Sequence, residues 1–268
     1  MNDKELPSYR RPPVIEVVCG AQFGELASFS SVHYGKFWSR VAAEYPRTEE
    51  REPLAEIFEG AHVTQVKDEV VTLSIPPLRR VFYVSEDENY LLQVQSTRFH
   101  ANWRRRRDED QYPRFTAAKA RFLNGWRQFN EFLRDENVDE PKVNQYELSY
   151  INHIFGTTAL PEGIQDQLGC FTWRNAQTLK FLPAPSAVNL RLQFTLPEGK
   201  GTLRVTVNHG KRASDKADVM LMELTARGPG KNDAADMESW FSLAHEWIVT
   251  GFTDLTTAEA HSRWGREK

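Results

Sequence analysis

The stretch PPVIEVVCGAQFGEL at residues 12–26 indicates a strand that leads into a helix. A second stretch of the same kind, VNQYELSYINHIFG, occupies residues 143–156. When the two are aligned, Glu16 matches Glu147, and each stretch is followed by further strands and a helix that carries tryptophan. Self-similarity of this kind indicates a repeated structural unit. We therefore predict an internal duplication.

The halves are predicted to span residues 1–138 and 139–268 as one compact unit. Strands that gather between helices, instead of alternating singly with them, favour an α+β fold with antiparallel sheets. We expect each half to be a curved sheet packed on a long helix, in a helix-grip or TATA-binding-protein-like arrangement about a pseudo-two-fold axis. Besides the opening strands, the pattern predicts strands at 61–66, 70–75, 80–85, 90–103, 187–196, 201–208 and 219–226, helices at 33–45, 115–136 and 236–252, a short tail helix, and a charged connector at 47–53.

The longest of these runs, residues 90–103, contains a polar row. Gln93, Gln95 and Thr97 fall on one face of an ideal strand, and apolar side chains fall on the other. Antiparallel sheets commonly leave one face in water. We expect the polar row to be a wet surface that contacts a partner.

Composition limits the class of protein. The chain has 268 residues, a net charge of −3 and a sequence pI near 6.2, whereas nucleic-acid-binding domains usually carry a basic excess. No apolar run approaches the ~18 residues of a membrane span, so we expect a cytoplasmic protein that contacts no membrane. CxxC spacing, phosphate loops and nucleophile elbows are absent from the sequence, which predicts neither a metal nor another cofactor.

The strongest local charge signal is NWRRRRDEDQYPR at residues 102–114. Guanidinium groups suit phosphates and carboxylates, and Trp103 could stack on the bases of single-stranded nucleic acid. The acidic residues 108–110, however, neutralise most of the run Arg104 to Arg107. A solvated turn whose charges pair with one another is therefore favoured over an anion site.

Glu16 and Glu147 each interrupt an apolar strand. A buried carboxylate needs a partner, and an arginine such as Arg98 could supply one. The two carboxylates could instead line a shared groove with His153 and perform acid–base chemistry. A third interpretation is that each points to water, because side chains alternate along a strand.

His245 precedes Glu246, but the second histidine of a zinc-binding HExxH motif is missing. We therefore expect His245 to form a hydrogen bond within a packed helix–sheet interface.

Several motifs occur in a fixed order: PPVIEVVCGAQF, FW-x-R-x-x-x-x-YP, LLQVQ-x-x-R-F-x-x-NWR, YPR, Y-x-N-H-I and HEWIVTGFTDLTT-x-x-x-H-x-x-W. Together they span residues 12–265 and resemble a sporadically distributed family of uncharacterised prokaryotic proteins. The resemblance implies a mobile gene, of the kind found in toxin–antitoxin or phage-defence islands. It also marks characteristic positions: Arg98, Asn102, Trp103, Arg104, His153, His245, Trp247, His261 and Trp264.

We accordingly predict a non-enzymatic interaction module that recognises a protein partner through a sheet face or a groove between the halves. The alternatives are nucleic-acid binding through Arg104–Arg107 and Trp103, and an enzyme with a cleft between the halves. The binding candidates are Gln93, Gln95, Arg98, Asn102, Trp103, Arg104, Glu16, Glu147, His153 and His245.

Overall fold

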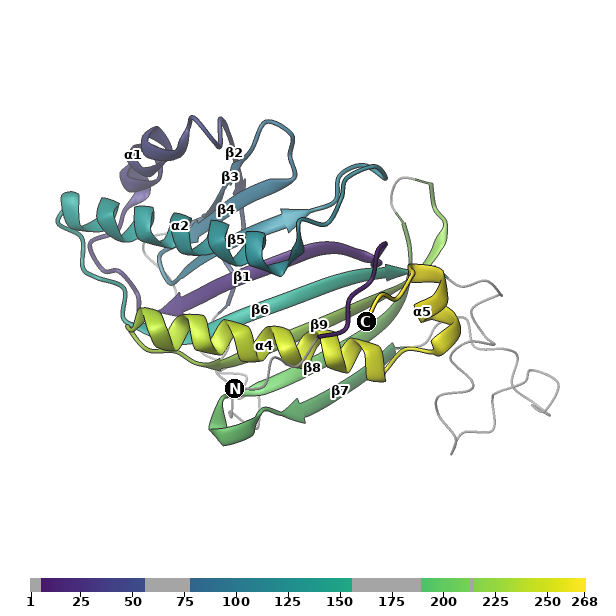
Figure 1. Cartoon of the computed structure of the whole chain (residues 1–268). Helices are drawn as coiled ribbons and strands as arrows, with labels where there is room; N and C mark the ends of the chain where they lie inside the picture. Colours follow the sequence, from purple (N-terminus) through teal and green to yellow (C-terminus); the bar gives the residue numbers. More distant parts are fainter. Residues whose placement is uncertain (1–5, 56–77, 156–188, 213–214) are drawn as a thin grey trace, which may run out of the picture.

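A computed structural model of the chain describes residues 6–55, 78–155, 189–212 and 215–268. Within these ranges the strands form one antiparallel sheet, in the order β2-β3-β4-β5-β1-β6-β9-β8-β7 (Figure 1). The strands are β1 (Val14–Phe23), β2 (Arg47–Arg51), β3 (Arg80–Val84), β4 (Tyr90–Gln95), β5 (Arg98–Arg104), β6 (Val143–Ile154), β7 (Asn189–Thr195), β8 (Thr202–Lys211) and β9 (Asp218–Pro229), and the helices are α1 (Ser31–Val41), α2 (Arg114–Asp135), α4 (Ala234–Asp254) and α5 (Ala258–Trp264).

The two stretches that resemble each other in sequence pair at the centre of the sheet. β1 and β6 run antiparallel, with Val17 opposite Tyr150 and Gly20 opposite Glu147. β5 flanks β1 on one side, and β9 flanks β6 on the other. The prediction of an α+β fold with a large antiparallel sheet is thus confirmed, and the sheet is continuous across the predicted boundary between halves.

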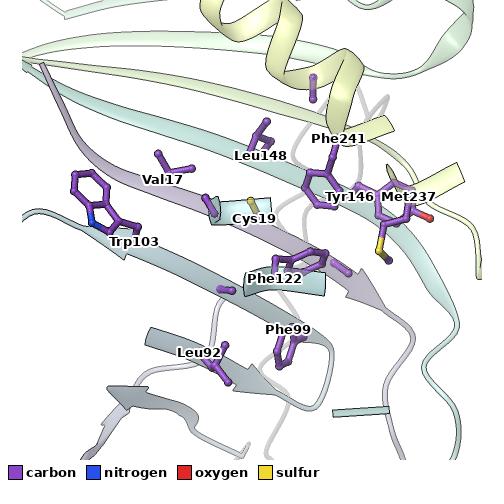
Figure 2. Packing of buried hydrophobic residues seen from close by; sticks show 14 of the residues in the cluster. Val17, Cys19, Leu92, Phe99, Trp103, Phe122, Tyr146, Leu148, Met237 and Phe241 are labelled. Atoms are coloured by element: carbon purple, nitrogen blue, oxygen red, sulfur yellow. The ribbon is translucent and has the colours of Figure 1, made fainter. Parts of the chain in front are cut away.

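Both long helices cover the same face of the sheet (Figure 1). α2 packs on β5 and β1, and α4 packs on β6, β9 and β8. The apolar faces of both helices contact the side chains of the sheet face beneath them. Phe122 of α2 contacts Phe99 of β5, and Phe241 of α4 contacts Tyr146 of β6 (Figure 2). Among the described residues, no helix is both long and apolar enough to cross a bilayer.

Three predictions about strands need correction or fall outside the described residues. The run 90–103 is a hairpin of β4 and β5, because the chain turns at residues 96–97 and Gln95 pairs with Arg98. The predicted connector 47–53 contains β2, an edge strand, where exposed charges are well tolerated. The strands predicted at 61–66 and 70–75 lie outside the described ranges.

Residues 6–13, which we call the N-terminal arm, are held against the C-terminus. The amides of Arg10 and Arg11 donate to the carbonyls of Gly265 and Trp264, each at 3.0 Å. Tyr9 is buried, and its hydroxyl lies 2.8 Å from Thr253 Oγ1. The N-terminal arm and the C-terminal residues therefore meet beside α5.

Candidate functional site

A chain of hydrogen bonds crosses four strands on the sheet face that points away from α2 and α4. Arg80 Nη1 donates to Gln93 Oε1 at 3.0 Å, and Gln93 Nε2 donates to Asn102 Oδ1 at 2.8 Å. Asn102 Nδ2 then donates to Glu16 Oε1 at 2.5 Å. Burial raises the pKa of Glu16, and the hydrogen bond from Asn102 opposes that rise. The network links β3, β4, β5 and β1 through polar side chains.

A buried ion pair lies beside this network. Arg227 Nε on β9 donates to Glu147 Oε2 on β6 at 2.6 Å, and both side chains are at most 15% exposed. Burial alone would raise the pKa of Glu147, but the charge of Arg227 holds it below its ordinary value. The nearby His100 on β5 is also buried, and burial lowers its pKa to about 4. His100 is therefore neutral near pH 7.

Gly20 on β1 provides the space for His100. A Cβ at Gly20 would lie 2.2 Å from His100 Cδ2, closer than real carbon atoms approach. The glycine thus lets the imidazole lie across the backbone of β1, toward Glu147 on β6.

Replacing Gly20 with alanine should lower the free energy of unfolding by about 1–3 kcal/mol, because the buried imidazole must move. Gly24→Ala is the matched control, since nothing lies within 4 Å of a Cβ at that position. Urea unfolding followed by circular dichroism measures both variants. Equal stability of the two variants would show that His100 does not depend on Gly20.

The expectation of a wet polar row is wrong. Gln93, Gln95 and Thr97 are buried. Gln95 exchanges hydrogen bonds with the backbone of Leu54, at 2.9 Å in each direction, and Gln95 Nε2 also donates to Thr97 Oγ1 at 3.0 Å. Intramolecular partners replace water here, so these side chains are not a free docking surface.

The carboxylates considered for acid–base chemistry do not meet. Glu16 lies opposite Ile151, four residues from Glu147 along β6, or about 13 Å. Arg98 pairs with Gln22, six residues from Glu16 along β1 and about 20 Å away. His153 lies two residues beyond Ile151 on β6, about 7 Å from the position opposite Glu16 but six residues, or about 20 Å, from Glu147, and its amide donates to the Pro13 carbonyl. These candidates spread along the strands instead of converging in one cleft, and the partner of Glu147 is Arg227 rather than Arg98.

The arginine run is mostly paired. Arg104 Nε donates to the Glu88 carbonyl at 2.9 Å, and Arg106 forms an ion pair with the Glu88 carboxylate at 3.1 Å. Asp110 accepts the backbone amides of Arg106 and Arg107. Trp103 is 2% exposed and contacts Tyr112 on the helix side of the sheet, so it offers no face on which a base could stack.

An open groove of about 930 Å³ lies at the end of the sheet where β1 begins and β5 and β6 end. We call it the end groove. Among the described residues that line it, six are arginines and three are acidic. The arginines are Arg10 and Arg11 of the N-terminal arm, Arg105, Arg114, Arg212 and Arg263, and the acidic residues are Asp108, Glu109 and Asp110.

Among the described arginines of the end groove, Arg105 is the one with a buried side-chain nitrogen, Nε, that has no hydrogen-bond partner. Burial lowers its pKa. The pKa of His153, which also lines the end groove, is lowered first by burial and then by the charges of Arg212 and Arg105. The end groove therefore contains a donor that lacks an acceptor.

No family model and no curated protein matches the chain. Its backbone is similar to that of Methanococcus jannaschii TBP, with 11% identity, over 91% of this chain and 99% of that one. The TM-score is 0.25. A likeness this weak carries no argument about function.

Sequence analysis missed two kinds of site residue. His100 alternates with Arg98 and Asn102 along β5, so its face of the sheet could have been predicted. Arg227 and Arg263 carry no local signal, because only strand register and the docking of α5 bring them to their positions. Across the described ranges, no three His, Cys, Asp or Glu side chains gather to hold a metal ion.

Proposed function

We propose that this chain is a non-enzymatic binding module whose end groove receives an acidic segment of a protein partner. The observation that carries the proposal is the gathering of six arginines around the end groove, against three acidic side chains, among the described residues. Arginine binds carboxylates in a planar, bidentate geometry.

The mixed charge of the end groove favours a protein over a nucleic acid. Asp108, Glu109 and Asp110 lie among the arginines, so the groove presents charges of both signs instead of a continuous basic track. Interfaces with nucleic acid are much more uniformly positive, whereas protein interfaces pair charges of both signs. The burial of Trp103 also removes the stacking residue that single-stranded binding would use.

The duplication is part of the same proposal. Glu16 lies opposite Arg104 of β5, just as Glu147 lies opposite Arg227 of β9. The same kind of pair thus flanks each central strand, which supports two related halves about a pseudo-two-fold axis between β1 and β6. The end groove would then lie between the halves.

The cellular setting is proposed from sequence alone. The motif resemblance supports membership of the sporadic prokaryotic family and a mobile, defence-type gene context. The partner would then be a toxin or a defence effector that is encoded nearby in the same cytoplasm.

Reversing two groove charges should weaken partner binding at least about tenfold, because like charges would then face the acidic segment. The variant is Arg11→Glu combined with Arg263→Glu, both exposed in the groove. Arg134→Glu, on the exposed surface of α2, is the matched control. Tagged protein is recovered from the native host after nuclease treatment, and bound proteins are quantified by mass spectrometry.

Loss of a protein partner in the groove variant alone supports the proposal. Equal recovery by the groove variant and the control contradicts it. Material that disappears with nuclease would instead assign the arginines to nucleic acid.

A further inference from the structure

A second, largely apolar cavity lies on the opposite side of the sheet from the polar network. It lies between α2 and α4, above β6 and β9, and the N-terminal arm forms one wall. Its volume is about 230 Å³. An apolar cavity of about 150 Å³ is already enough to hold benzene. The aromatic side chains that line it are Tyr9, Tyr112, Phe115, Tyr150, His245 and Phe252.

The cavity is a pocket that is partly open to solvent, not an enclosed void. The cavity lies beside residues that pack tightly, since Ile248 and Leu224, which line it, are at most 1% exposed. An apolar lining binds water poorly, so the space suits an apolar occupant.

His245 is the polar group that could orient such an occupant. Its ring lies flat on Phe115, with centroids 4.0 Å apart and planes 5° apart, and it forms no hydrogen bond to any described residue. This differs from the predicted role, a hydrogen bond within a packed interface. Burial, with a smaller effect of the Lys119 charge, lowers the pKa of His245 to about 4, so the imidazole is neutral and keeps one acceptor nitrogen.

The tyrosine hydroxyls are less suited than His245 to accept a hydrogen bond from an occupant of the cavity. The hydroxyls of Tyr112 and Tyr150 lie 2.8 Å apart and share one hydrogen bond, and the Tyr9 hydroxyl is bonded to Thr253. The cavity therefore combines flat aromatic walls with one imidazole that has unused hydrogen-bonding capacity. Among the other polar side chains that line the cavity, Arg114 donates to the Tyr9 carbonyl and Asn152 to the Met222 carbonyl. An apolar lining with a few polar groups is typical of small-molecule sites.

We propose that this cavity binds a planar aromatic small molecule with a single hydroxyl or N–H donor, of the size of a phenol or an indole, and that His245 accepts its hydrogen bond. The aromatic ring would occupy the space between α2 and α4 under the N-terminal arm. This site adjoins the end groove, since Pro12, Tyr112 and Arg114 line both, but the proposal does not depend on the function proposed there.

Two matched probes test the proposal, para-fluorophenol and fluorobenzene, which differ by one hydroxyl. Fluorine NMR titration of the full chain should show saturable one-to-one binding, with the phenol bound about fivefold more tightly. His245→Phe should remove that preference while it keeps the binding of fluorobenzene. Val249→Phe, which fills the cavity from α4, should abolish binding of both probes, and Thr116→Trp, from α2, is a second blocking variant if the first does not fold.

Absence of saturable binding by the wild-type chain would overturn the proposal. A preference for the phenol that survives His245→Phe would overturn the assignment of the acceptor. Binding that persists in a folded blocking variant would place the probe elsewhere on the molecule.

Discussion

Replacing Arg227 with methionine should lower the free energy of unfolding by about 3–5 kcal/mol. The substitution keeps the volume of the side chain but leaves the carboxylate of Glu147 buried without its ion-pair partner. The remaining positive neighbour, Arg98, compensates only in part, because its effect on the pKa of Glu147 is smaller than that of Arg227. Urea unfolding at pH 7, followed by circular dichroism, measures the loss.

A double variant separates the buried charge from the packing. Arg227→Met combined with Glu147→Leu removes both charges, and replacing a whole buried pair is often nearly neutral. We expect the double variant to recover most of the stability lost in the single one. If the double variant is as unstable as Arg227→Met alone, the loss comes from packing and not from an unpaired carboxylate.

Lowering the pH from 6.5 to 4 should destabilise the fold by about 3 kcal/mol through His100 alone, at about 1.4 kcal/mol per pKa unit. In the unfolded chain this imidazole binds a proton near pH 6.5, whereas in the folded chain it does so only near pH 4. The unfolded state therefore binds more protons across this window, and stability falls as the pH falls. His245 has a similar shift and adds to the loss.

The comparison with His100→Gln isolates the effect of His100. The pKa of His100 also depends on the charges of its neighbours Glu147, Arg98, Arg80 and Arg227. The raised pKa of Glu16 increases stability as the pH falls, which opposes the effect of His100. The pH dependence of the wild-type stability therefore does not isolate His100. The variant should lose about 3 kcal/mol less than the wild type between pH 6.5 and pH 4. Parallel curves for the two proteins would mean that His100 titrates normally in the folded state.

Local periodicity predicted most of the helices and strands. The apolar stripe predicted a helix at 115–136, and α2 spans Arg114–Asp135. A second apolar stripe predicted a helix at 236–252, which lies within α4 (Ala234–Asp254). The turn between β4 and β5 was missed because residues 96 and 97, Ser and Thr, include no glycine, proline or asparagine of the usual hairpin types. β2 was missed because its charged side chains hide the pattern of an edge strand.

The sites were harder to predict because they depend on long-range register. The end groove joins Arg11 to Arg263 only because the N-terminal arm pairs with the C-terminus, where Tyr9 forms a bridge with Arg266. Alternation placed Gln93 and Gln95 on the polar face, but it cannot say that the chain itself buries them. Burial of polar groups follows from tertiary contacts such as the one between Gln95 and Leu54.

The most direct test of the end groove is site-specific photo-crosslinking in the native host. A photoreactive phenylalanine analogue replaces Phe155, which lines the groove and is 42% exposed, or Phe194 of β7, which is 38% exposed and lies outside it. We predict that the probe at position 155 crosslinks a protein through an acidic segment, and that the probe at position 194 does not. Crosslinks to nucleic acid at position 155, or the same protein captured equally from both positions, would contradict the proposed function.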